Sequence, residues 1–333
     1  MGTEIAMAPE QLLPFIECLR RAGSLTSAQL AAEAGASLAA LHGARRGLAR
    51  LGLRYAPVRD TWCWPAPAPP LDAAALAALA LSAQAQPLGL EVHYAPLVGS
   101  TNDLAWARAR ARGCAQLVVA EGQWAGRGRR GRQWRSPLGA GLYVSIALPL
   151  PAGGEAAGLS LAVGVVLVES LTALGVPGLA LKWPNDVVHA RGKVGGILLE
   201  LQHQGGERWL ILGMGLNIHP LPEAGDQALA LRALGLRRNR EALLEAFVPA
   251  LLAEAQQFFA AGLTPGLRDR YRALDAYRGA VVRAETQGRR WEGRYGGIDE
   301  AGLIVVETAQ GLERLGHGEV TLRRLEDGQV RYG

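Results

Sequence analysis

The stretch VGGILLELQHQGGERWLILGMGLNI, residues 194–218, decides the fold of the central part of this chain. It holds two apolar runs, residues 194–204 and 208–218, with Gly205 and Gly206 between them. Consecutive glycines between two strands are typical of a hairpin, because glycine adopts the positive φ values that a tight turn needs. We therefore predict two antiparallel strands joined by a glycine turn.

Outside this hairpin, strand patterns alternate with helical ones. After a helical segment at 71–84, we expect strands at 91–97, 117–123 and 142–148, and helices at 102–112, 157–174 and 240–261. Such alternation indicates one α/β domain, which we assign to residues 71–273.

The two ends of the chain show different patterns. Residues 9–21, 26–34 and 37–52 read as short helices, with Thr26 or Ser27 and then Ser37 as N-caps, and residues 53–64 as a ribbon. This pattern is typical of a winged helix-turn-helix, over 1–64, and the run PAPAPP at 65–70 predicts a stiff linker. Short strands divided by glycine, at 289–298 and 303–308, predict a small barrel over 274–333. The expected class is multidomain α/β (α+β).

The bulk composition excludes several classes of protein. The 333 residues are 49% hydrophobic and 20% charged, as in folded globular proteins. The longest apolar stretch, 158–168, is too short to span a bilayer, and the N-terminus lacks the pattern of a secretory signal, so we expect a cytoplasmic protein with no membrane partner. The three cysteines are widely spaced, so we expect neither disulfides nor a metal site.

The basic residues are distributed unevenly between arginine and lysine. The net charge is +5, which is compatible with a polyanionic partner such as DNA or a nucleotide. Of 35 basic residues only Lys182 and Lys193 are lysine, and both fall in one short segment. Because lysine supplies the compact ammonium that arginine cannot, we interpret both as site residues; the alternative is chance survival of two surface lysines.

Residues 122–134, GQWAGRGRRGRQW, interleave four arginines with glycines. The glycines disfavour helix and strand, so we expect a mobile loop that closes over an anion. Guanidinium groups bind phosphate oxygens in fixed geometry, and Trp134 offers a flat face for a base. The alternative is a solvated basic loop that touches nucleic acid.

Three further motifs lie in the same domain. In KWPND, 182–186, followed by RGKVGG, 191–196, an ammonium can hold a carboxylate against a phosphate; the alternative is an Asx turn with a packed tryptophan. In STND, 100–103, Ser100 and Asp103 fit a capping box, and the functional alternative is a polar ligand site at a helix N-terminus. GMGLN, 213–217, is a weak glycine pattern, and no phosphate loop or dinucleotide fingerprint is present.

Taken in this order, the five motifs resemble those of bacterial biotin–protein ligases, in particular the bifunctional biotin ligases and biotin-operon repressors. The resemblance implies an N-terminal winged helix-turn-helix and a class II synthetase-like mixed-sheet catalytic domain. It also implies an SH3-like C-terminal barrel, carried by residues 297–303 and 318–323. The full arginine loop together with KWPND argues against a lipoate ligase.

The same resemblance implies a two-step reaction and its site. Biotin and ATP, with Mg²⁺, give biotinyl-5′-AMP, and a lysine of the biotin carboxyl carrier protein of acetyl-CoA carboxylase then displaces AMP. The implied catalytic residues are Lys193, Arg129, Asp186 and Lys182, with Asn185 near phosphates or magnesium. The implied binding residues are Ser100, Thr101, Asn102, Gln123, Gly126, Arg127, Gly128, Arg129, Arg130, Arg132, Trp134, Lys193, Gly195 and Asn217.

The segment on which repression depends departs from a strong recognition helix. The expected recognition helix contains Gly43 and Gly47, each of which costs about 1 kcal/mol relative to alanine in a helix interior. Its candidate DNA contacts are Ser37, His42, Arg45, Arg46 and Arg50. Three hypotheses stay open: a ligase and operator-binding repressor that dimerises with adenylate bound, a ligase whose winged helix does not bind DNA, and a ligand-sensing transcription factor without catalysis.

Overall fold

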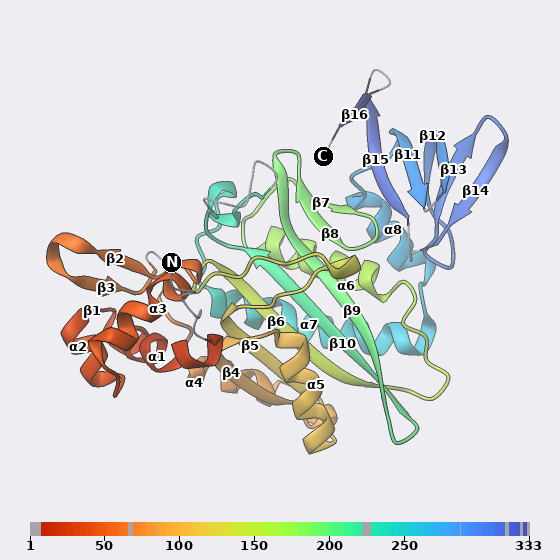
Figure 1. The fold of residues 1–333 in the computed structure, drawn as a ribbon. Coiled ribbons are helices and arrows are strands. Elements are labelled where there is room, and N and C mark those ends of the chain that lie inside the picture. Colours follow the sequence, from red (N-terminus) through yellow and green to blue (C-terminus); the bar gives the residue numbers. More distant parts are fainter. Residues whose placement is uncertain are drawn as a thin grey trace.

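The computed structural model describes residues 8–65, 69–82, 84–221, 228–286, 288–316, 320–326 and 329–331. Three sheets organise them: three strands near the N-terminus, seven in the middle and six near the C-terminus. The N-terminal unit and the C-terminal sheet lie at opposite ends of the central sheet (Figure 1). The predicted mixed α/β class is confirmed for the central part of the chain.

The central sheet has the strand order β4-β5-β6-β10-β9-β8-β7. Only β4 and β5 run parallel, and every other neighbouring pair is antiparallel. The predicted hairpin at 194–218 is confirmed: β9 and β10 pair along most of their length, and Gly205 and Gly206 form the turn at φ 58° and 85°. The strands are β4 (Glu91–Val98), β5 (Gln116–Gln123), β6 (Gly141–Leu150), β7 (Leu179–Lys182), β8 (Asp186–His189), β9 (Gly192–Gln204) and β10 (Glu207–Asn217).

Helices cover both faces of this sheet. On one face α6 packs against α7, and α6 is buried along most of its length because it is apolar on nearly all sides. On the other face the alanines of α5, Ala105 and Ala109, pack on Trp209 and Ile211 of β10. The helices of this unit are α4 (Ala73–Ala78), α5 (Thr101–Arg112), α6 (Leu159–Ala173), α7 (Arg240–Ala261) and α8 (Pro265–Leu274), with short 3-10 turns at Leu79–Leu81, Gln86–Leu88, Arg129–Gly131 and Leu231–Leu234.

The N-terminal unit consists of three helices and a small antiparallel sheet. The predicted caps are confirmed, because Thr26 Oγ1 accepts from the Gln29 N–H and Ser37 Oγ from the Ala40 N–H. Gly47 has a packing reason, since a Cβ there would lie 2.8 Å from Leu12 Cδ1. The elements are a 3-10 turn (Pro9–Leu12), α1 (Leu13–Ala22), β1 (Ser24–Thr26), α2 (Ser27–Glu33), α3 (Leu38–Arg50), β2 (Arg54–Ala56), a 3-10 turn (Pro57–Arg59) and β3 (Thr61–Cys63).

The C-terminal sheet is antiparallel, with the order β14-β13-β12-β11-β15-β16. Its two edge strands do not pair with each other in the described residues, so barrel closure and the SH3-like assignment stay predictions. Residues 317–319, part of a motif behind that assignment, lie outside the described residues. The strands are β11 (Val281–Thr286), β12 (Arg289–Ile298), β13 (Ile304–Thr308), β14 (Gly311–Leu315), β15 (Thr321–Glu326) and β16 (Gln329–Arg331).

Both outer units are joined to the central sheet by specific contacts. The Leu138 N–H donates to the Leu51 carbonyl, and Leu97 and Leu138 complete the N-terminal core. Arg240 donates to the Pro69 carbonyl at the end of the expected 65–70 linker, whose residues 66–68 lie outside the described ones. On the other side, Trp183 Nε1 donates to the Gly302 carbonyl. These joints fix the units around the central sheet.

Several sequence predictions differ from the structure. The helix expected at 71–84 is shorter, because α4 gives way to a 3-10 turn after Ala78. The strands β7 and β8, four residues each, and the helix α8 were not predicted, since such short segments carry little periodicity. The three cysteines are free thiols. No helix of the described part is both long and apolar enough to cross a membrane.

Candidate active site

A cavity of about 520 Å³ opens on the face of the central sheet that carries α5. The start of α5, the 122–134 loop, the β7–β8 hairpin and the strands β9 and β10 line it, and so does the start of β15 from the C-terminal sheet. Segments from five parts of the sequence therefore form one pocket.

The floor of the pocket depends on glycines that face each other across β9 and β10. Gly196 pairs with Gly215, and Leu198 with Gly213. A Cβ on Gly215 would lie 2.5 Å from Trp134 Nε1, and a Cβ on Gly213 would collide with the side chain of Asn102. The weak GMGLN pattern is thus required sterically, because Trp134 and Asn102 lie directly on the sheet backbone.

A β-bulge aims Lys193 into the pocket. Asp186 pairs with Gly196 and Val187 with Gly195, but Val188 pairs with Lys193, so Val194 is an extra residue in β9. Without the bulge, strict alternation would put Lys193 and Gly196 on opposite faces. With it, both face the cavity.

Lys193 lies between an acid and an aromatic ring. Its Nζ donates to Asp186 Oδ1 at 2.7 Å and lies 5.2 Å from the ring centroid of Trp134. The indole Nε1 of Trp134 is buried and has no hydrogen-bond partner in the described part of the chain. The Asn217 amide donates to the Lys193 carbonyl at 3.2 Å, so Asn217 supports the lysine from behind.

The 122–134 loop is a two-armed structure with a tight tip. Its arms meet where Arg127 bridges to Gln133, and the tip residues Arg130 and Gly131 have φ 59° and 70°. Arg129 Nη1 donates to Asn185 Oδ1 at 3.3 Å, and Arg130 Nη1 to Thr321 Oγ1 at 2.7 Å. The loop therefore contacts the β7–β8 hairpin and the C-terminal sheet.

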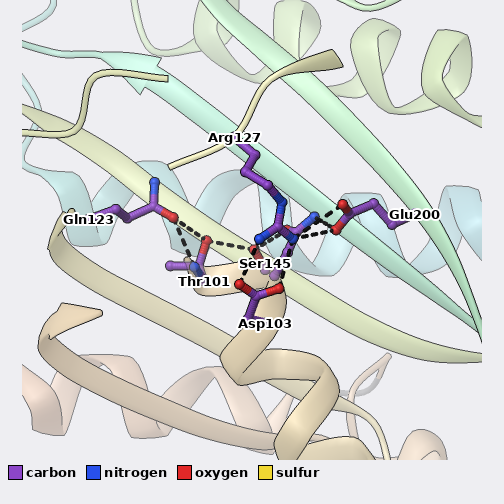
Figure 2. Close-up of polar contacts among 7 residues, drawn as sticks. Thr101, Asp103, Gln123, Arg127, Ser145 and Glu200 are labelled. Atoms are coloured by element: carbon purple, nitrogen blue, oxygen red, sulfur yellow. Dashed lines mark hydrogen bonds and ion pairs between the residues drawn. The ribbon is translucent and has the colours of Figure 1, made fainter. Parts of the chain in front are cut away.

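Arg127 differs from the other arginines of the loop. Its guanidinium lies between the carboxylates of Asp103 and Glu200 (Figure 2), with donor–acceptor distances of 2.6 and 2.8 Å to Asp103. The hydrogen bonds to Asp103 raise the pKa of Arg127 above its ordinary value. The carboxylates of Asp103 and Glu200 therefore hold the Arg127 side chain in place.

The start of α5 shows that one prediction was wrong. Ser100 occupies the N-cap position, but its side chain makes no capping hydrogen bond, and Asp103 binds Arg127 instead of closing a capping box. The Thr101 N–H, free of the helix, donates to Gln123 Oε1 at 2.8 Å. The N-terminus of α5 is thus satisfied from the arginine loop rather than from its own residues.

The pocket brings together most of the predicted site residues. All of them line it except Gly126, Gly195 and Asn217. Gly126 lets the loop arms approach, since a Cβ there would lie 2.5 Å from the Trp134 carbonyl, and Gly195 points at Leu216 on the other face. Asn217 reaches the site only through the Lys193 carbonyl.

Sequence reasoning missed the contributions of Glu200, Ser145 and the start of β15. Glu200 has a signal in retrospect, because it follows Gly196 and Leu198 at a spacing of two residues on the pocket face of β9. Ser145 is a lone polar residue in an apolar strand. For Thr321 and Arg323 no local signal exists, since they come from another sheet.

The electrostatics of the pocket favour an anion. Eight basic side chains and one acidic one, Asp186, are among the described residues that line it. Burial lowers the pKa of Lys182, whose ammonium lies 5.8 Å from the Tyr277 ring, and burial and then Arg130 lower the pKa of Arg129. A bound anion would repay part of this desolvation and repulsion.

The candidate DNA contacts lie on α3 and at its N-cap, outside the segments that line the pocket. Figure 1 shows α3 at the end of the central sheet opposite the C-terminal sheet. His42, Arg45, Arg46 and Arg50 are exposed on one helix, and Arg45 lies 4.7 Å from the Tyr55 ring centroid of the ribbon. Ser37 is also exposed, but its hydroxyl caps the helix.

Comparison with known proteins agrees with this geometry. Residues 94–217 match the model of the biotin/lipoate A/B protein ligase family. The bifunctional ligase/repressor BirA of Escherichia coli is 34% identical over 244 residues, 72% of this chain and 76% of that protein. The biotin–[acetyl-CoA-carboxylase] ligase of Paracoccus denitrificans is 33% identical over 61% of this chain and 88% of its own. The biotin protein ligase of Aquifex aeolicus, solved in complex with biotin and ATP, superposes with a TM-score of 0.62 at 29% identity and covers 71% of this chain and 99% of its own.

Proposed function

The chain belongs to the biotin/lipoate A/B protein ligase family, and from this premise we propose that its pocket makes biotinyl-5′-AMP and passes biotin to a carrier lysine. It is an ATP-dependent biotin–protein ligase. The proposed acceptor is the biotin carboxyl carrier protein of acetyl-CoA carboxylase, and the proposed location is the cytoplasm. The observation that carries the proposal is Lys193, aimed by a bulge onto a glycine floor beneath an arginine loop.

The first step requires two anions to meet, the biotin carboxylate and the α-phosphate of ATP. We assign Lys193 to neutralise both during in-line attack, since its ammonium lies beside the glycine floor, 3.4 Å from where a Cβ on Gly196 would stand. Asp186 orients this ammonium and, in the second step, receives the acceptor lysine. Lys182 supports the phosphates from the β7–β8 hairpin.

The reactive adenylate has to be kept from water between the two steps. Arg129, Arg130 and Arg132 cover the phosphate side, and Trp134 packs on the adenine. The polar groups of Ser100, Thr101, Asn102 and Gln123 hold the biotin head, and Arg127 and Gly128 line the same pocket. Gly126 and Gly195 contribute indirectly, because they leave room for the Trp134 carbonyl and for Leu216. Asn217 acts through Lys193.

Magnesium is proposed to enter with ATP. No group of three His, Cys, Asp or Glu side chains that could hold a metal is present among the described residues. The pocket does offer the oxygens of Asn185 and Asp186, a donor set that suits a Mg²⁺ ion held mainly by substrate phosphates. The ion would neutralise phosphate charge there.

The deciding experiment is biotin transfer to a purified carrier domain with biotin, ATP and Mg²⁺. We expect ATP-dependent labelling of one carrier lysine and biotin-dependent exchange of pyrophosphate into ATP. In Arg129→Gly we expect adenylate to escape and to label bystander lysines. Retention equal to that of wild type would remove Arg129 from the assignment, and absence of both activities would refute the proposed function.

A second function, repression of biotin-synthesis genes, is favoured by the exposed basic face of α3. The relatives named bifunctional ligase/repressor BirA support it, and we propose that adenylate-bound dimers bind an operator. The competing proposal is a ligase whose N-terminal unit does not bind DNA. A gel-shift titration with adenylate and a salt series separates them: salt-sensitive binding that Arg46→Ala weakens supports repression, whereas an absent or salt-insensitive shift supports the second.

A further inference from the structure

A continuous polar chain runs beneath the arginine loop and joins its two arms. It starts at Arg127 on the first arm and ends at Ser136, just after the second. Figure 2 shows most of it, with Glu200 at one end and Gln123 at the other. Four elements contribute: the loop, α5, β6 and β9.

Glu200 makes two separate contacts in this chain. Its carboxylate accepts from Arg127 Nη2 at 3.1 and 3.2 Å and from Asn102 Nδ2 at 2.6 Å. Of these two partners of Glu200, Asp103 binds only Arg127. Glu200 is therefore the residue of β9 that contacts both the loop and the α5 N-terminus.

The contact with Asn102 fixes the polar groups farther along. With its nitrogen on Glu200, the buried Asn102 amide presents Oδ1 to Ser145 Oγ at 2.6 Å. Ser145 Oγ also lies 2.7 Å from Thr101 Oγ1. An amide flip would place the Asn102 oxygen against the Glu200 carboxylate, and two acceptors repel each other, so the Glu200 charge sets the orientation of the amide.

From Thr101 the chain reaches the second arm of the loop. The Thr101 hydroxyl and N–H both meet Gln123 Oε1, at 3.1 and 2.8 Å, and Gln123 Nε2 donates to Ser136 Oγ at 2.8 Å. Ser136 Oγ in turn lies 3.2 Å from the Trp134 carbonyl. Displacing Glu200 would therefore disturb Arg127 directly and Trp134 through five side chains.

We propose that Glu200 is a positioning residue for the ligase reaction: it holds the arginine loop over the pocket and orients the Asn102, Thr101 and Gln123 groups that bind the biotin head. This role rests on the proposed function of the pocket. Arg127 then serves as the anchor of the loop, and the phosphate contacts fall to Arg129, Arg130 and Arg132.

The test compares Glu200→Gln with a control that removes a carboxylate from the same hairpin, Glu207→Gln. Glu207 is exposed at the far end, and no ion pair of it is found in the described residues. In Glu200→Gln we expect backbone hydrogen exchange of residues 126–134 and the KM for biotin each to rise about tenfold, the size of losing one charged hydrogen bond. We expect kcat to stay within about threefold, because Lys193 is untouched.

Asp103→Asn separates the two contacts of Glu200 and guards against a folding defect. Asp103 has a side chain 63% exposed, and it touches Arg127 but not Asn102. We expect faster loop exchange, with the KM for biotin changed by less than about threefold, since the α5 groups keep Glu200. If Glu200→Gln does not fold, unchanged loop exchange in Asp103→Asn overturns the anchoring role of Arg127.

The proposal is overturned if Glu200→Gln matches Glu207→Gln in loop exchange and in KM. Hydrogen exchange does not depend on catalysis, so it decides the anchoring even if the wild-type chain were to make no biotinyl-adenylate. A wild-type chain that makes no biotinyl-adenylate would refute the proposed function and leave the polar chain as a structural feature.

Discussion

Two ion pairs in the catalytic unit have nearly the same length but different surroundings. Glu121 and Arg240 meet at 2.6 Å, and their side chains are 0% and 5% exposed. Asp186 and Lys193 meet at 2.7 Å, and theirs are 23% and 36% exposed. The first pair is buried beside the Pro69 carbonyl, and the residues of the second pair line the pocket.

The difference in burial assigns different roles to the pairs. Glu121 also accepts from the Leu71 N–H and from the Tyr94 hydroxyl, while Arg240 donates to the Pro69 carbonyl, so the buried pair fixes the chain where it enters the domain. Among the described residues the Lys193 ammonium meets one carboxylate, and it lines the cavity. A half-open pair can exchange its partner for a ligand, and a buried one cannot.

Breaking the buried pair should have the largest effect. In Glu121→Ala we expect the free energy of unfolding to fall by about 3–5 kcal/mol, because Arg240 keeps an uncompensated buried charge. Urea denaturation followed by circular dichroism measures it. Replacing both residues, Glu121→Leu with Arg240→Met, should recover much of the loss. A free energy of unfolding for Glu121→Ala within about 1 kcal/mol of the wild-type value would contradict the stabilising role of this pair.

Breaking the pair in the pocket should affect activity instead. In Lys193→Ala we expect biotin-dependent pyrophosphate exchange to fall at least about a hundredfold, the scale of removing one transition-state charge contact. The unfolding midpoint should hardly change, since the pair is partly solvated. The exposed Arg238→Ala serves as the control. If Lys193→Ala lost stability but kept its pyrophosphate exchange, the roles assigned to the two pairs would be wrong.

A carboxylate without a cation sharpens the contrast. Asp275 follows α8, has no ion pair within the described residues, and burial raises its pKa from 3.8 to about 6. Its stabilising contribution is complete below pH 3.8 and is lost as the pH rises through 6. Asp275→Asn should therefore be more stable than wild type at pH 7, by about 3 kcal/mol, and equal to it near pH 4. Thermal melts of both proteins between pH 4 and pH 7 test this. A stability difference that does not change with pH would rule out titration of Asp275 as its cause.

An exposed pair should have the smallest effect. Glu169 meets Arg270 at 2.7 Å, with side chains 46% and 39% exposed, and Arg270 also holds Glu254. In Glu169→Gln we expect the free energy of unfolding to fall by less than about 1 kcal/mol, because water screens the charge and Arg270 keeps its contact with Glu254. Urea denaturation at low and high salt checks this, and a loss as large as that of Glu121→Ala would invalidate burial as the deciding variable.

Local sequence was enough for those features that depend on nearby residues. The Gly205–Gly206 turn, the Thr26 and Ser37 caps and the apolar α6 follow from patterns within a few residues. The capping box at Ser100 failed because Asp103 has a stronger partner in Arg127, which lies 24 residues away. A local rule holds until a distant charge competes with it.

The sequence by itself determined the family, the central α/β class and many of the residues that line the pocket, because spaced motifs and hydrophobic periods can be recognised within short segments. Tertiary structure alone decided what each residue does. A bulge at Val194, invisible to strand alternation, turns Lys193 to the pocket face. Glu200 gains its place only because β9 passes beside α5 and the arginine loop, and Thr321 because the C-terminal sheet folds back onto Arg130. Contacts between segments far apart in the chain leave no periodic pattern, so folding has to bring them together before their chemistry can be recognised.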